Sequence, residues 1–154
     1  MKKMTDREFL EQLVGYEVWA NEQWLGTLGR FKDRARAEGV MRHIVGCYNG
    51  WLGLVAEWEG KPHDELDLEA DMKDLLRRWR VVVQTRDLDE VVEFTGGKGN
   101  KRRLSVRELV HHVLNHGSYH RGHLRGLAES EGLADFPETD SLYYFIPRRS
   151  ETLD

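Results

Sequence analysis

The sequence predicts an all-α protein, a four-helix bundle in a single domain over residues 1–154, with a short hairpin or loop between the third and fourth helices. Four long segments repeat apolar residues at spacings of three and four, the periodicity of amphipathic helices. Proline occurs only at positions 62, 137 and 147, so the long intervals between them are free to be helical. With 40% hydrophobic residues in 154, the chain can bury one sizeable core.

The first two predicted helices cover residues 5–28 and 36–59. The inward stripe of the first helix consists of Phe9, Leu13, Tyr16, Ala20 and Trp24. The inward stripe of the second helix consists of Met41, Ile44, Tyr48, Trp51, Val55 and Trp58. Gly60, Pro62 and Asp64 follow directly, and we expect them to end the second helix.

The third predicted helix covers residues 68–86, after which the apolar period changes. Its stripe consists of Leu68, Met72, Leu75, Trp79 and Val82. The segments VVEF (91–94) and KRRL (101–104) are short and favour β structure, and the glycine-rich TGGKGN lies between them. This pattern predicts a small hairpin or an irregular loop.

Ser105 is the predicted start of the fourth helix, and Glu108 three residues later completes a capping box. The inner stripe of this helix consists of Leu109, Val113, His116, His120, Leu124 and Leu127. Gly132 is expected to help end the helix. The following segment, FPETDSLYYFIPRR (136–149), is too aromatic for a free terminus, so we expect it to pack back on the bundle.

The composition argues against several classes of partner. A net charge of −4 and a pI of about 6.0 do not favour nucleic acid. No apolar run is long enough to span a membrane, and MKKMTDREFL turns acidic where a signal peptide needs an apolar segment. The single Cys47 cannot form an internal disulfide, which agrees with a reducing compartment. We therefore expect a cytoplasmic protein.

Histidines in LNHGSYHRGHL (114–124) form the candidate site. With Leu109 at zero on a helical wheel, His116 falls near about −20° and His120 near about +20°, inside the apolar stripe. Their i,i+4 spacing allows both rings to bind one divalent cation. For HxxxH alone, two hydrogen-bonded core histidines are the favoured interpretation. His112 and His116 offer the same spacing, and a helix rotated by about 40° reverses the choice of pair.

A third ligand must come from another helix, and His43 is the natural candidate. It is flanked by Val40, Cys47 and Trp51 and is at least partly inward on the second helix. Its depth in that helix agrees better with His116 and His120 if the second and fourth helices are antiparallel. We interpret Cys47 as a small buried hydrophobe rather than a thiolate ligand or nucleophile.

The sequence identifies no general base, so the catalytic residues stay unassigned. Val113, Leu114 and Asn115 separate His112 from His116, and none of them is the glutamate of a HExxH motif. Asn115 and Arg121 lie away from the metal-facing side of the wheel, which favours surface or interhelical hydrogen bonds. Asn21, in WAN, is equally consistent with a buried neighbour of the site and a structural core amide.

These residues together resemble the DinB/YfiT-like family of metal-binding four-helix bundles. The resemblance rests on NHGSYHRGHL, HIVGCYNGWL, YEVWANEQWL, the helix start at Ser105 and the SLYYF tail, in this order. It implies an up-down-down-up bundle, often a homodimer, with zinc or nickel held by His43, His116 and His120. Where the family commonly has glutamine after HRG, this chain has His123, which allows a fourth ligand or a hydrogen-bond donor beside the site.

The resemblance also implies a class of chemistry, because characterised relatives include transferases and isomerases that use low-molecular-weight thiols. Three neutral histidines with open positions are typical of a catalytic metal site. The first hypothesis is therefore a metal-dependent enzyme, a thiol-dependent transferase or hydrolase that acts on a small molecule. The alternative is a non-catalytic, stress-associated metal-binding homodimer, which the missing acid–base residue favours.

Overall fold

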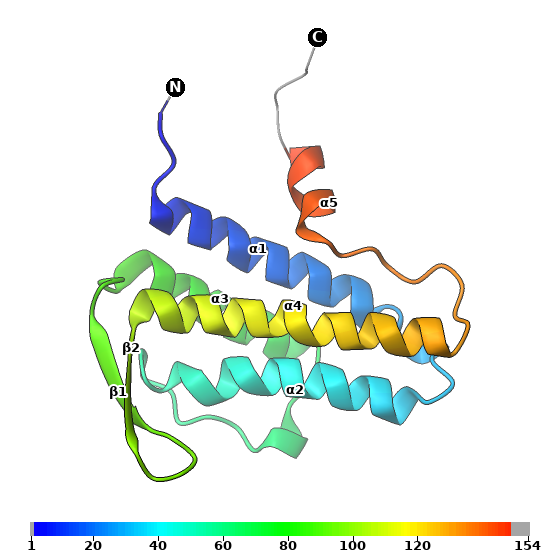
Figure 1. The fold of residues 1–154 in the computed structure, drawn as a ribbon, viewed down its shortest axis with the longest axis horizontal. Helices are drawn as coiled ribbons and strands as arrows, with labels where there is room; N and C mark the ends of the chain where they lie inside the picture. Colours follow the sequence, from blue (N-terminus) through cyan, green and yellow to red (C-terminus); the bar gives the residue numbers. More distant parts are fainter. Residues whose placement is uncertain (1, 149–154) are drawn as a thin grey trace.

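The computed structural model describes residues 2–148, and in this range the chain is mostly helical with one small sheet (Figure 1). The elements are α1 (Asp6–Leu25), α2 (Arg34–Leu52), α3 (Ala70–Thr85), β1 (Val91–Thr95), β2 (Lys101–Ser105), α4 (Val106–Ser130) and α5 (Ser141–Phe145). No helix in this range is long and apolar enough to cross a membrane. The expected tail extends to residue 149, which lies outside the described residues.

The four long helices lie side by side, with α1 and α4 running in one direction and α2 and α3 in the other (Figure 1). Contacts that agree with these directions are Asp6–Arg107 and Glu17–Arg121 for α1 with α4, Glu11–Gln84 and Glu22–Lys73 for α1 with α3, and Asp33–Glu131 and Trp51–His112 for α2 with α4. This is the up-down-down-up order that the resemblance implies, and it makes α2 and α4 antiparallel neighbours.

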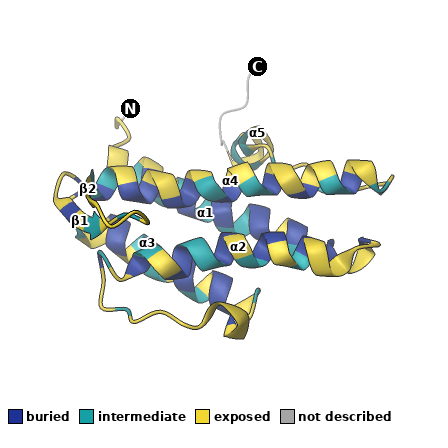
Figure 2. Ribbon diagram, turned by 60° about the horizontal axis from the view of Figure 1, so that its bottom comes forward, coloured by how far each residue is buried: buried dark blue, intermediate teal, exposed yellow. Residues whose placement is uncertain are grey.

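The core lies where the buried faces of the long helices meet (Figure 2). The predicted stripe of α3 is confirmed at Met72, Leu75, Trp79 and Val82, all of which are buried. Trp79 also donates its indole N–H to the Tyr48 carbonyl at 3.0 Å, so a polar contact joins α3 to α2 inside the apolar core. Burial of these large side chains is the main force that holds the helices together.

The hairpin and the start of α4 follow the sequence prediction. Strands β1 and β2 are antiparallel, with Val91 opposite Ser105. The capping box at Ser105 is confirmed, because the Glu108 backbone N–H donates to Ser105 Oγ at 3.1 Å and the Ser105 N–H donates to Glu108 Oε2 at 2.7 Å. These two hydrogen bonds satisfy backbone donors that the first turn of α4 leaves free.

Helix α2 is shorter than predicted, because it ends at Leu52 and not at residue 59. The Asn49 side chain accepts the Lys61 N–H and donates to the Lys61 carbonyl, both at 2.9 Å, and it also accepts the Trp58 indole N–H at 3.1 Å. These bonds hold the segment after Gly53 against the end of α2. Val55 is therefore buried without being helical, which explains why the apolar rhythm continued past the helix end.

The inward stripe predicted for α1 is partly wrong. Phe9 is 47% exposed, and its ring stacks on Phe145 of α5 with centroids 6.3 Å apart. The buried positions of α1 are Leu10, Val14, Tyr16, Glu17, Ala20, Asn21 and Trp24. The helix thus has two apolar faces, one against the bundle and one against the C-terminal segment, and sequence periodicity merged them.

The C-terminal segment packs back on α1, as predicted for the part that the structure describes. Trp24 donates its indole N–H to Thr139 Oγ1 at 2.9 Å, and the Tyr16 hydroxyl donates to the Thr139 carbonyl. Phe136 stacks on Trp24 with centroids 6.3 Å apart. Residues 136–145 therefore cover the side of the bundle where α1 and α4 meet.

Candidate metal centre

Three histidines from two helices come together where α2 and α4 run side by side. His43 lies on α2 and His116 and His120 on α4, and one nitrogen from each ring lies within 4.8 Å of the other two. The Nε2 atoms of His43 and His116 are 3.1 Å apart. The ring of His120 is 4.3 Å from each of the other two rings, measured between centroids. The structure thus brings together all three residues singled out in the sequence.

The depth of these rings differs from the expectation. His116 and His120 are only partly buried and His43 is exposed, so the group lies at the edge of the core. The buried face of α4 consists of Val106, Leu109, Val110, Val113, Leu114, Gly117, Arg121, Leu124 and Ala128. Its centre is rotated by about 80° from Leu109, which leaves His116 and His120 on its flank. The site is therefore open to solvent on one side.

The environment of the rings favours their neutral form. Burial, together with the neighbouring rings of His120, His43 and His112, lowers the pKa of His116 to about 4. Burial, with His43 and His123 nearby, also lowers the pKa of His120. Near neutral pH both rings therefore keep the nitrogen lone pair that a metal ligand needs.

The residues present fit a divalent cation. Tetrahedral zinc with Zn–N bonds of about 2.0–2.1 Å needs ligand nitrogens about 3.3 Å apart. The 3.1 Å separation between His43 and His116 is close to this value, and the limit of 4.8 Å for the group requires only small side-chain movements. His116 Nδ1 is buried and has no hydrogen-bond partner among residues 2–148. Without a metal, the Nε2 contact between His43 and His116 can be a hydrogen bond between the two rings. A divalent cation would replace it by taking a lone pair from each neutral ring.

The other candidates of the sequence analysis do not join the group. His112 packs edge-on against Trp51, with centroids 5.4 Å apart, and it is exposed. His123 is exposed as well and influences His120 only through its charge. Burial, and to a smaller extent the negative charge of Glu17, raises the pKa of Cys47 to about 12, so its sulfur stays a thiol. The interpretation of Cys47 as a small hydrophobe rather than a thiolate is the one that this pKa supports.

A buried ion pair behind the site was only partly foreseen. Arg121 and Glu17 are paired, with side chains 2% and 1% exposed. Arg121 Nη1 also donates to Asn21 Oδ1 at 2.8 Å, and Tyr48 donates its hydroxyl to Glu17. The network joins α1, α2 and α4. Arg121 makes the interhelical bonds that its wheel position favoured, Asn21 is a core amide, and Glu17 was missed.

The position of Glu17 carried a weak signal in the sequence. Gly117 has no side chain, and a Cβ added there would overlap the Glu17 carboxylate. A glycine facing a charged residue across two helices is visible only when the pairing of the helices is known. Sequence spacing alone therefore could not identify the ion pair.

Comparison with known proteins agrees with the resemblance seen in the sequence. The sequence model of the DinB family matches residues 1–145 of this chain. Protein DinB of Bacillus subtilis (strain 168) is 25% identical over 166 residues, which cover 92% of this chain and 96% of that protein. No solved structure matches the chain significantly.

Proposed function

Because the chain belongs to the DinB family and brings three imidazoles together at one edge of its bundle, we propose that it binds a divalent cation, zinc or nickel, through His43, His116 and His120. The observation that carries this proposal is the convergence of one nitrogen from each ring within 4.8 Å. The lowered pKa values of His116 and His120 support it, since only neutral rings bind metals.

The bound cation serves an enzyme of the thiol-dependent transferase or hydrolase type that acts on a small molecule. Three protein ligands leave coordination positions open, which is typical of catalytic sites, and His43 faces solvent. The raised pKa of Cys47 removes the chain's own thiol as a nucleophile. In the transferase scheme, the thiolate then comes from a low-molecular-weight cosubstrate.

The residues of the chain have separate tasks in this scheme. His43, His116 and His120 would hold the cation, which would supply Lewis-acid chemistry and lower the pKa of a thiol or water. Trp51 packs edge-on against His112 and Phe94, with ring centroids 5.4 and 5.0 Å apart, and so connects the His112 side of the site to the hairpin. Tyr119, which is 76% exposed, lies 5.0 Å from the ring of His120 and can contact a substrate there.

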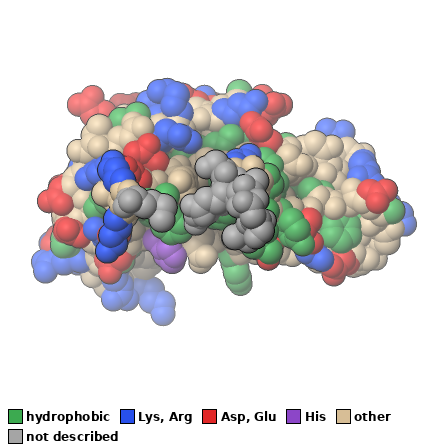
Figure 3. Space-filling view, turned by 90° about the horizontal axis from the view of Figure 1, so that it is seen from above, with side chains coloured by type: hydrophobic (Ala, Val, Ile, Leu, Met, Phe, Trp, Pro, Cys, Tyr) green, Lys and Arg blue, Asp and Glu red, His purple; other side chains and the backbone are tan. Residues whose placement is uncertain are grey.

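A non-catalytic, stress-associated metal-binding homodimer is the second candidate. Among residues 2–148, the histidine group itself contains no carboxylate, so it supplies no carboxylate general base. Phe9 of α1 and Leu142 and Tyr143 of α5 also remain exposed. Figure 3 shows several separate hydrophobic patches on the face that it draws. Such side chains are suited to contact a second subunit.

Metal analysis tests the shared part of both candidates. Untagged protein is expected to copurify with about one divalent cation per chain, and His43→Ala to lose at least about 90% of it, because two remaining ligands bind weakly. His123→Ala and His112→Ala are the matched controls and should retain the metal. Equal metal content in His43→Ala and His123→Ala would contradict the three-histidine site.

Turnover separates the two candidates. The enzyme is expected to transfer a thiol to, or hydrolyse, at least one electrophile in a panel of thiols and small electrophiles, and His120→Ala should lose this activity. Metal-loaded protein without turnover over the whole panel would favour the homodimer. Light scattering then measures the molar mass in solution, which should be twice that of one chain if the protein is a homodimer.

A further inference from the structure

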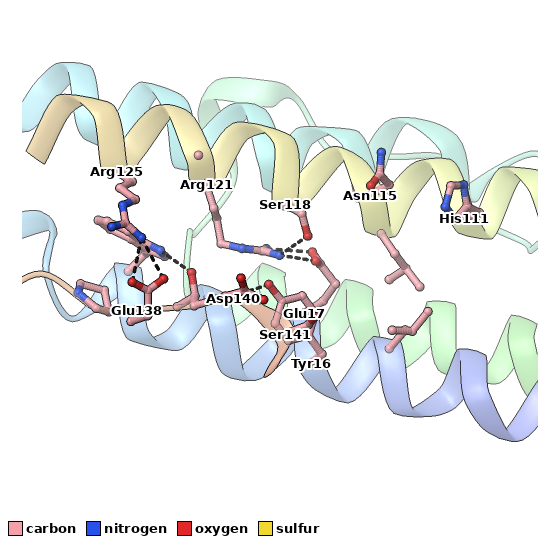
Figure 4. Close-up of a pocket in the computed structure, with 16 residues that line it drawn as sticks. Tyr16, Glu17, His111, Asn115, Ser118, Arg121, Arg125, Glu138, Asp140 and Ser141 are labelled. Atoms are coloured by element: carbon pink, nitrogen blue, oxygen red, sulfur yellow. Dashed lines mark hydrogen bonds and ion pairs between the residues drawn. The ribbon is translucent and has the colours of Figure 1, made fainter. Parts of the chain in front are cut away.

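A cavity of about 440 Å³ lies between α1 and α4, beneath the segment 137–141 (Figure 4). Ser118, Arg121 and Arg125 of α4 line it, and on a helical wheel they lie about 100–180° from His116 and His120. The cavity thus opens on the other side of α4 from the histidine group. Its volume is within the range of about 300–1,000 Å³ that small-molecule sites occupy.

The walls of the cavity are held in place before any ligand arrives. The buried pair of Glu17 and Arg121 forms part of the lining. The segment 137–141 is tied to α1 by the Trp24–Thr139 hydrogen bond of 2.9 Å and to α4 by Arg125, which donates to Glu138 at 2.7 and 2.9 Å. A preformed cavity avoids part of the ordering cost that binding otherwise carries.

The lining determines which chemistry fits. Both arginines of the cavity are already ion-paired, Arg121 with Glu17 and Arg125 with Glu138, so a carboxylate of the chain offsets each positive charge. Among residues 2–148, Arg121 Nε alone of the two guanidinium groups' buried atoms has no hydrogen-bond partner, and it is shielded from solvent. Asp140 adds one further negative charge to the lining. A carboxylate or phosphate is therefore disfavoured.

Hydroxyl groups in the lining have a proton to offer, and Ser118 and Thr139 are two of them. Ser118 Oγ accepts from Arg121 Nη2 at 3.1 Å, and Thr139 Oγ1 accepts from the Trp24 indole at 2.9 Å. Each hydroxyl can still donate its own O–H. Apolar wall surface comes from Leu13, Trp24, Leu114 and Pro137. The lining thus combines apolar walls with hydroxyl donors and has no unpaired cation.

We propose that this cavity is a second ligand site, which binds a small uncharged molecule with an apolar group and a carbonyl oxygen that accepts a hydrogen bond from a hydroxyl of the lining, such as Ser118 or Thr139. The site does not depend on the metal, because α4 separates the two.

Benzamide is the probe, followed by two-dimensional proton–nitrogen NMR at the Trp24 indole N–H. It is expected to shift this resonance saturably, and benzoate and benzylammonium to bind more weakly. Gly122 lines the cavity, whereas Gly126 one turn later does not, and a Cβ at either position meets open space. Gly122→Phe should weaken benzamide binding by about tenfold or more, and Gly126→Phe should leave it within about twofold.

The melting temperature of each variant tests whether it is folded. If Gly122→Phe does not fold, Gly122→Leu takes its place. His120→Ala is expected to bind benzamide like the original chain, so failure of the metal site does not affect this result. Equal affinity of Gly122→Phe and Gly126→Phe for benzamide, or tighter binding of either charged probe, would overturn the proposal.

Discussion

His116 lies between the rings of His43, His112 and His120, and its pKa reflects that crowding. A proton on this ring would face partial burial and neighbouring rings that also carry charge when protonated. Both effects disfavour the protonated, positively charged ring and lower its pKa from 6.5 to about 4. His116 is therefore ready for a metal ion and unfavourable for a proton.

The pKa of His116 predicts how the metal-free protein responds to acid. Between pH 6.5 and about 4 the unfolded chain binds a proton at His116 that the folded chain does not. The free energy of unfolding should therefore be highest above pH 6.5 and fall as the pH decreases through this window. Urea unfolding at several pH values measures the slope. His116→Asn should show a smaller slope, and an unchanged slope would contradict the assignment.

At the scale of elements, α4 presents different chemistry on each side. Its flank toward α2 carries the histidines, its buried face carries Arg121, and its side toward α1 borders the cavity. The buried pair of Arg121 and Glu17 is flanked by hydrogen bonds to Asn21 and Tyr48. These partners offset the desolvation of the two charges.

Removal of one partner of this pair should be severe. Arg121→Met leaves the Glu17 carboxylate buried without its cation, and the free energy of unfolding is expected to fall by about 3–5 kcal/mol. Arg125→Met on the same helix removes exposed ion pairs and the contact of Arg125 with the Phe136 ring, and should cost about 1 kcal/mol. Chemical denaturation compares the two variants. The double variant Glu17→Leu/Arg121→Met should recover much of the loss, and similar losses in the two single variants would contradict the buried pair.

At the scale of the whole molecule, the order of helices places α2 beside α4 and so creates the histidine group. A cation that bridges the two helices binds the folded chain and not the unfolded one. At a free concentration of about 100 times its Kd it stabilises the fold by about 2.7 kcal/mol. For a chain of this size we expect a rise in Tm of about 5–10 °C.

Calorimetry with and without zinc, and again after a chelator, measures this shift in Tm. His43→Ala is expected to lose it, because the link between α2 and α4 is broken, whereas His123→Ala should keep it. A shift of the same size in both variants would place the cation elsewhere.

Much of the fold could be predicted because it depends on neighbouring residues. The capping box of Ser105 and Glu108 and the hairpin around TGGKGN involve partners within a few positions of one another. The end of α2 could not be predicted in the same way. It depends on Asn49, whose side chain holds a segment that begins nine residues later.

The candidate site was predictable in composition but not in depth. The spacing of His116 and His120 and the expected partly inward position of His43 on the second helix were sufficient to propose one group, although His43 is exposed in the structure. Their position at the edge of the core was not, because it depends on how far α4 is rotated about its own axis. That rotation reflects the packing of Arg121 and Gly117 against Glu17, a residue 104 and 100 positions away from them in the chain.

By itself, the sequence determined where most of the long helices begin, that they are amphipathic, and which histidines share a face. These properties arise from backbone capping and helical periodicity, which act over a few residues. Only the tertiary structure decided the solvent exposure of the histidine group, the buried ion pair behind it and the cavity on the opposite side of α4. Each of these depends on contacts between side chains from different helices, and the spacing of residues within one helix does not determine such contacts.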